Sequence, residues 1–170
     1  MDTKLLAAYW SLGQLKSEAL PRIAQEALEE GLDSPSVRML AGEQNPIMSD
    51  AGPVFEQVLI ELSVAIPQRR EAAIRIAKHH AEAIVSGRIS AIEGARRIIG
   101  EAYHYCDELN ELLAFVGLED QHEEFSDEFH RNHYGEEYCR NVLIETEEAI
   151  IQEATNLINH PSDSKPGGRG

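Results

Sequence analysis

The sequence predicts an all-α protein: a single-domain bundle of about six to seven helices at residues 1–160, followed by a flexible tail at residues 161–170. Apolar residues recur at steps of three and four along most of the 170-residue chain, and the alternation typical of β-strands is almost absent. The chain is 42% hydrophobic, which suffices for a core in one domain of this length. The last residues are polar and rich in glycine and proline, which is typical of a mobile end.

Three short helices are predicted near the N-terminus. The first spans residues 5–12 and stops at a glycine. The second runs from Pro21 to Gly31, because proline suits a first helical turn and glycine suits a C-terminal stop. Ser34 caps the third helix, which ends at Gly42. The inward residues expected in the first two helices are Leu5, Tyr9, Leu12, Ile23, Ala27 and Leu28.

Residues 42–53 contain several glycine, proline, asparagine and aspartate residues, and they predict a loop. Residues 54–66 are apolar on more than one helix face, which is typical of a central helix. Pro67 should end that helix and begin the next one, which Gly87 closes. The inward stripe expected in this next helix consists of Ile74, Ala77, Ala81 and Ile84.

The clearest pattern predicts one long helix over residues 92–116. Ser90 and Glu93 form a capping box before it, in which each side chain binds the other's free amide. Apolar residues then alternate at steps of three and four, as in a coiled-coil seam. Gly117 is predicted to end the helix. The seam consists of Ile92, Ala95, Ile99, Ala102, Cys106, Leu109, Leu113 and Val116.

Negative charge is concentrated in the C-terminal part of the chain. Residues 101–170 hold 17 acids and 4 bases, which accounts for nearly all of the formal net charge of −15. The densest segment is 119–137, where large apolar side chains are few. A last helix is predicted from about residue 136 to residue 159. Its inward residues should be Cys139, Leu143, Thr146, Ile150 and Leu157.

Such an acidic segment repels nucleic acid and anionic membranes, and it attracts basic proteins. We see neither a membrane-spanning apolar run nor a secretory signal, and two cysteines make no disulfide framework, so we expect a cytoplasmic protein. The sequence therefore predicts a surface for a basic partner, with aromatic anchors among the acids and Tyr138 as a further anchor. Its residues are Glu119, Asp120, Glu123, Glu124, Phe125, Asp127, Glu128, Phe129, Tyr134, Glu136 and Glu137.

Acid–histidine pairs suggest a metal site as an alternative. An acid stands three residues before a histidine in three places, against about 1.2 expected from 30 acids and seven histidines in 170 residues. Two such pairs on facing helices build the di-iron site of ferritin-like bundles. Here the ligands would be Glu101, His104, Glu119 and His122.

That metal site is disfavoured, because Glu101 and His104 flank the apolar seam instead of lying on it. A second metal set would combine Cys106 and Cys139 with His104 and either His130 or His133. Both cysteines fall on apolar stripes, where a free cysteine acts as a small hydrophobic residue. We therefore predict no cofactor, no metal and no catalytic residue.

No separate function is expected for the histidines of the acidic segment or for the basic region. The histidines at positions 122, 130 and 133 could take up protons near neutral pH, but a pH switch needs a bistable element that the sequence does not show. The one basic region is expected to balance the acidic segment instead of binding phosphate. It consists of Arg69, Arg70, Arg75, Lys78, Arg88, Arg96 and Arg97.

Two stretches carry a resemblance. Residues 30–42 (EGLDSPSVRMLAG) and 87–98 (GRISAIEGARRI) resemble segments of small uncharacterised bacterial all-helical proteins. Some proteins of that kind are similar to immunity proteins encoded beside secreted toxins. The resemblance covers about 25 residues, mainly helix boundaries, so it implies a related fold and transfers no catalytic residue.

Together these observations predict a protein-interaction module, most readily an immunity or inhibitor protein that binds and neutralises a basic toxin or enzyme. Two alternatives stay open. One is a metal-dependent helical enzyme that uses the Glu-x-x-His pairs. The other is a structural homo-oligomer assembled through the 92–116 seam.

Overall fold

The computed structural model describes residues 1–107 and 109–160. Within these residues every regular element is a helix, which confirms the all-α prediction. The chain divides into two compact units, Met1–Ala72 and Ala73–Gly170. The tail predicted at 161–170 lies outside the described residues.

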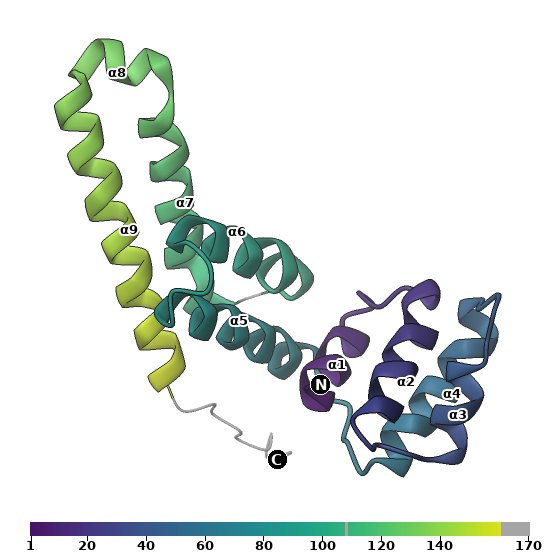
Figure 1. Ribbon diagram of the computed structural model, residues 1–170. Coiled ribbons are helices and arrows are strands. Elements are labelled where there is room, and N and C mark those ends of the chain that lie inside the picture. Colours follow the sequence, from purple (N-terminus) through teal and green to yellow (C-terminus); the bar gives the residue numbers. More distant parts are fainter. Residues whose placement is uncertain (108, 161–170) are drawn as a thin grey trace. The chain divides into compact units, whose positions relative to one another are not determined.

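The helix count differs from the prediction. The described residues contain nine α-helices instead of six or seven (Figure 1). The helix predicted at 92–116 is divided into two, and a further helix, Glu128–Tyr134, lies in the acidic segment, for which no helix was predicted. Three short 3₁₀ helices accompany them, at Ser17–Ala19, Tyr103–Tyr105 and Asn110–Leu112. The α-helices are α1 (Thr3–Ser11), α2 (Leu20–Glu29), α3 (Pro35–Ala41), α4 (Met48–Glu61), α5 (Arg69–Val85), α6 (Ala91–Glu101), α7 (Leu113–Ser126), α8 (Glu128–Tyr134) and α9 (Glu136–Asn159).

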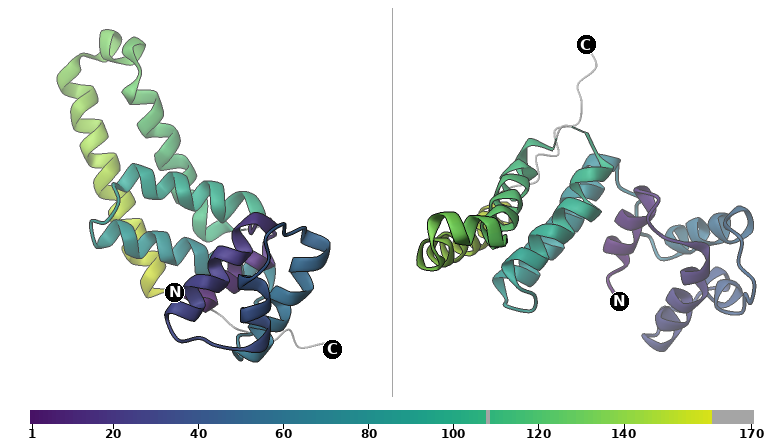
Figure 2. Two further views of the ribbon diagram at one scale, coloured as in Figure 1. Left: turned by 45° about the vertical axis from the view of Figure 1, so that its right-hand side comes forward. Right: turned by 90° about the horizontal axis from the view of Figure 1, so that it is seen from above.

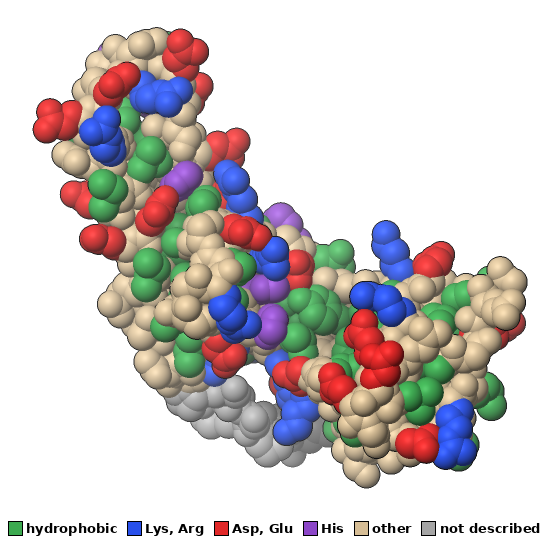
Figure 3. All heavy atoms as spheres, viewed as in Figure 1, with side chains coloured by type: hydrophobic (Ala, Val, Ile, Leu, Met, Phe, Trp, Pro, Cys, Tyr) green, Lys and Arg blue, Asp and Glu red, His purple; other side chains and the backbone are tan. Residues whose placement is uncertain are grey.

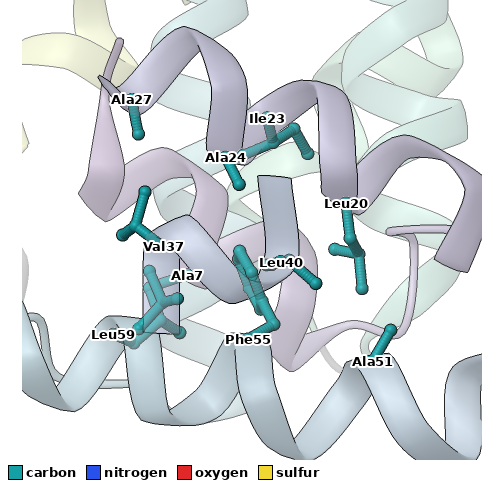
Figure 4. Packing of buried hydrophobic residues seen from close by; sticks show 11 residues of the cluster. Ala7, Leu20, Ile23, Ala24, Ala27, Val37, Leu40, Ala51, Phe55 and Leu59 are labelled. Atoms are coloured by element: carbon teal, nitrogen blue, oxygen red, sulfur yellow. The ribbon is translucent and has the colours of Figure 1, made fainter. Parts of the chain in front are cut away.

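The first unit packs α1–α4 around one apolar core (Figure 4). Phe55 of α4 lies at its centre, and the Trp10 ring of α1 packs on it with centroids 5.0 Å apart. In α1 the alanines Ala7 and Ala8 are fully buried, whereas the predicted stripe residue Leu5 is only half-buried. The buried core residues are Ala7, Leu20, Ile23, Ala24, Ala27, Val37, Leu40, Ala51, Phe55, Val58 and Leu59.

Two predicted helix boundaries of this unit are confirmed. Gly31 has φ +82°, and the backbone amide after it donates to the carbonyl of Ala27, which closes α2. The Ser34 hydroxyl accepts the Val37 amide at 3.3 Å, so it caps α3 as expected. These signals lie within one turn of the chain, which is why the sequence alone predicts them.

The start of α3 is also held by a side chain from another helix. The Glu61 carboxylate at the end of α4 accepts the Ser36 hydroxyl at 2.8 Å and the Ser36 amide at 3.1 Å. Hydrogen bonds from the Ser34 and Ser36 hydroxyls lower the pKa of Glu61. The sequence does not indicate this link, because its partners are 25 residues apart.

The loop predicted at 42–53 is wrong in its second half, because α4 begins at Met48. Pro53 is the sixth residue of the helix, so it leaves the Ser49 carbonyl without the helical hydrogen bond that an amide at position 53 would donate. Gly52 lies against the Trp10 ring, and a Cβ atom there would be 3.2 Å from Trp10 Cη2. The glycine therefore permits close packing of α1 on α4 instead of marking a loop.

The helix predicted at 54–66 also ends early, at Glu61. Ser63 adopts φ +56°, and the Val64 amide bonds the Leu59 carbonyl, which closes α4 without a glycine. The next helix begins at Arg69 instead of Pro67. Ile60 and Ile66 are exposed, so this apolar stretch is not central on all its faces.

In the second unit, α5 and α6 lie side by side (Figure 1). Ser90 caps α6 by accepting the Glu93 amide at 3.2 Å, while the Glu93 carboxylate pairs with Arg97, so the predicted capping box forms in part. Gly94 lies so close to Ile84 of α5 that a Cβ atom would be 2.2 Å from Ile84 Cγ1.

Helices α7 and α9 run side by side in opposite directions, and α8 crosses between their ends (Figures 1 and 2). The bounds predicted for the last helix, 136–159, are confirmed. Cys139 is buried, as predicted, and Leu143 is half-buried. The larger buried side chains of this unit are Ile76, Ile84, Ile98, Leu109, Leu112, Phe115, Cys139, Ile150 and Leu157.

The long helix predicted over residues 92–116 is wrong. Helix α6 ends at Glu101, and the chain passes through two 3₁₀ turns before α7 begins at Leu113. The break shifts the buried positions by one residue, so that Leu112 and Phe115 are buried while Leu113 is 47% exposed. The spacing of three and four therefore continues in the sequence through a region where the helix is interrupted.

The predicted stop at Gly117 is wrong as well, because α7 continues through it to Ser126. The acidic segment that follows is therefore mainly helical. None of the helices among residues 1–107 and 109–160 combines the length and apolar character needed to cross a membrane.

Candidate partner-binding site

The predicted binding residues all fall at one end of the α7–α9 hairpin. We call residues 119–138 the hairpin tip; it comprises the second half of α7, all of α8 and the start of α9. Between α7 and α8 the chain turns at Asp127, which has extended backbone angles. Between α8 and α9 it turns at Gly135, whose φ of +90° and ψ of 149° favour glycine. These two turns bring three short stretches of sequence together.

Phe125 anchors the tip. Its ring is half-buried, and the centroids of His130, Tyr134 and Tyr138 lie 5.7, 6.0 and 6.1 Å from its own. One side chain of α7 therefore contacts rings from both α8 and α9. Aromatic pairs at such separations stabilise beyond the area they bury, by about 0.5–1.5 kcal/mol each.

Rings around this anchor are largely exposed to solvent. Phe129 is 69% exposed, and Tyr134 and Tyr138 are each 52% exposed. They are linked through His133, whose ring is parallel to Phe129 at 6.3 Å and edge-on to Tyr134 at 4.6 Å. The predicted aromatic anchors thus form one continuous surface, to which the sequence did not assign His130 and His133.

Several acids of the tip are engaged within the protein. Glu119 is only 17% exposed, and it accepts Arg96 Nε of α6 at 2.8 Å. Glu124 lies 3.1 Å from His130 Nε2, and Asp127 lies 3.9 Å from His130 Nδ1. The Arg96 pair is one clear case of the internal charge balance that we predicted for the basic region.

Other acids of the tip face solvent: Asp120, Glu123, Glu128, Glu136 and Glu137. Glu128, Glu136 and Glu137 occupy first helical turns, where negative charge is favourable near the free amides. Residues 119–138 hold eight acids against one base, Arg131, and Arg140 follows one turn later in α9. Figure 3 shows acidic side chains along this hairpin with a few basic ones among them.

The residues proposed as metal ligands have other partners. Glu101 binds the buried His80 at 2.9 Å, Glu119 binds Arg96, and His122 lies 3.5 Å from Glu147 of α9. Among the described residues, no group of three or more His, Cys, Asp and Glu side chains could hold a metal ion. The predicted pairs are therefore not brought together as a ligand set.

We compared the chain with protein-family models, with curated proteins and with solved structures, and none of them matches it.

Proposed function

We propose that the hairpin tip is the docking surface for a basic protein partner. The observation that carries this proposal is the continuous patch of exposed rings, Phe129, Tyr134 and Tyr138, on a segment with eight acids and one base. Large exposed aromatic side chains are typical anchors of protein interfaces, while complementary charge speeds association and selects the partner.

The architecture of the tip supports this proposal. Phe125 packs against Tyr134 and Tyr138, and His130 and His133 pack against Phe129, so the rings are ordered within the free chain and lose little conformational freedom on binding. The rings contribute little to the core, since Phe129 is more than two-thirds exposed and Tyr134 and Tyr138 are each about half exposed. Together with the resemblance of residues 30–42 and 87–98, this favours an immunity or inhibitor protein that covers a basic active site.

A charge variant of the tip tests the proposal. It combines Asp120→Lys and Glu123→Lys with Glu128→Gln and Glu137→Gln. Lysine is placed in α7 beyond its first turn, and glutamine is used in the first turns of α8 and α9, where a cation would be unfavourable for the helix dipole. The control makes the same change in net charge at exposed acids elsewhere, with Glu29→Lys, Glu82→Lys, Glu18→Gln and Glu148→Gln.

Partners are captured with the wild-type chain, and each captured protein is purified and titrated against all three proteins. We expect a basic protein that binds the wild type and the control, and whose affinity falls at least about 100-fold with the tip variant. Its affinity for the wild type should also fall as salt rises. Equal binding by the tip variant, with unchanged helicity, would refute the proposal.

A further inference from the structure

The arrangement of rings and carboxylates at the tip distinguishes between the two kinds of basic side chain. Phe129 and His133 project from α8 one turn apart, Tyr134 follows, and Tyr138 lies on α9 with its ring 5.8 Å from Tyr134. The four rings form an unbroken series from one helix to the next. A side chain that approaches this surface therefore meets ring faces and ring edges before it meets backbone.

Exposed carboxylates occur on the same two helices as these rings. Glu128 on α8 and Glu137 on α9 are both exposed, and each precedes one of the rings, Phe129 or Tyr138, in the sequence. Glu124 and Asp127 contact His130, whose ring packs against Phe129 at 5.5 Å and against Tyr134 at 5.9 Å. The site thus offers flat π surfaces and paired carboxylate oxygens within the same few residues.

A guanidinium group can use both features at once. It is planar, stacks on aromatic faces, and donates two parallel hydrogen bonds to a carboxylate. An ammonium group is a compact, strongly hydrated charge that gains mainly the electrostatic term. Arginine is also the more frequent partner in cation–π contacts with Tyr and Phe.

The bases already present near the tip do not neutralise it. Arg96 pairs with Glu119, and the exposed Arg131 and Arg140 stand against seven further acids in residues 119–137. The tip is also pre-formed, because Phe125 holds Tyr134 and Tyr138 in place. The site is therefore complementary to a segment that brings several further cations.

We propose that the hairpin tip binds an arginine-bearing segment of its partner and discriminates against lysine at the same positions. This inference rests on the proposed function, since it names the chemistry of the partner at the same surface. It adds a prediction that charge alone does not make, namely that two ligands of equal charge bind with different affinity.

Two synthetic peptides of the same length and charge provide the test. One carries four arginines separated by glycine and serine, and the other carries four lysines in the same places. Both are titrated calorimetrically against the full chain at low salt. We expect the arginine peptide to bind at least about five-fold more tightly, in line with one or two cation–π contacts at an exposed site.

The variant Phe129→Leu/Tyr138→Leu removes ring faces and leaves every carboxylate in place. It should reduce the ratio of the two affinities, because two of the four rings are lost, while the lysine peptide binds nearly as before. Leu118→Ala, a half-buried change in α7 outside the tip, serves as a control for altered packing and should keep the ratio. Circular dichroism verifies that all variants retain their helices.

The outcomes separate this inference from the proposed function. Salt-sensitive binding of both peptides with equal affinity overturns arginine selectivity and leaves a basic partner supported. A ratio that is unchanged in Phe129→Leu/Tyr138→Leu overturns the role of the rings. Binding of neither peptide, at a salt concentration that favours charge attraction, counts against the proposed function and the selectivity together.

Discussion

Gly94 is the position where the packing of the second unit allows a sharp test. It lies within α6, where glycine costs about 1 kcal/mol relative to alanine. A Cβ atom there would be 2.2 Å from Cγ1 and 2.5 Å from Cδ1 of Ile84, and 3.2 Å from Cδ1 of Ile89. Ile84 is 4% exposed and branched at Cβ, so it has little freedom to move away.

Two opposing terms decide the stability of Gly94→Ala. Helix propensity favours alanine by about 1 kcal/mol. Forcing a methyl group into a closely packed contact costs about 1–3 kcal/mol. We expect a net loss of about 1 kcal/mol in the free energy of unfolding, which corresponds to a fall in Tm of about 2–4 °C for a chain of this size.

Gly100→Ala provides the matched control in the same helix, because no atom beyond the adjacent residues and the nearby backbone of the helix lies within 4 Å of the Cβ position. It should stabilise the protein by about 0.5–1 kcal/mol, so the difference between the two variants isolates the steric term. Urea unfolding followed by circular dichroism measures both. In a double-mutant cycle, Gly94→Ala should destabilise the Ile84→Ala protein less than it destabilises the wild type, because the clashing side chain is gone. If Gly94→Ala stabilises as much as Gly100→Ala, the close approach of α5 and α6 is refuted.

Two further predictions concern the register of α7 and the link from α4 to α3. Leu112→Ala should cost about 2–5 kcal/mol in the free energy of unfolding, because Leu112 is fully buried. Leu113→Ala should cost at most about 0.5 kcal/mol, because Leu113 is 47% exposed. If urea unfolding gives the reverse order, the observed break after α6 is contradicted. Since its folded-state pKa is lowered, Glu61 contributes stability above the usual carboxyl range, and this contribution is lost as pH falls through the folded value. Glu61→Gln should therefore lower the urea midpoint at neutral pH and leave a smaller acid-induced decrease between about pH 5 and pH 3, whereas parallel pH profiles for the two proteins would exclude the link.

The sequence was sufficient to predict which residues belong to the candidate site, but not which of their side chains are exposed or which contacts they make. The concentration of acids and the aromatic residues Phe125, Phe129 and Tyr134 are plain in the sequence. Whether these rings face the core or the solvent depends on the turns at Asp127 and Gly135, which together reverse the direction of the chain within ten residues. The pairing of Glu119 with Arg96 is equally hidden, because its partners belong to different helices.

Local chemistry determined what the sequence predicts correctly: the helical class, the cap at Ser34, the stop at Gly31 and the span of α9. Each of these depends on residues within a turn or two of one another. Tertiary packing alone decided the early start of α4, the break between α6 and α7, and the exposure of Phe129. Helical periodicity states which residues share a face, whereas burial depends on which segment covers that face, and distant parts of the chain supply the cover.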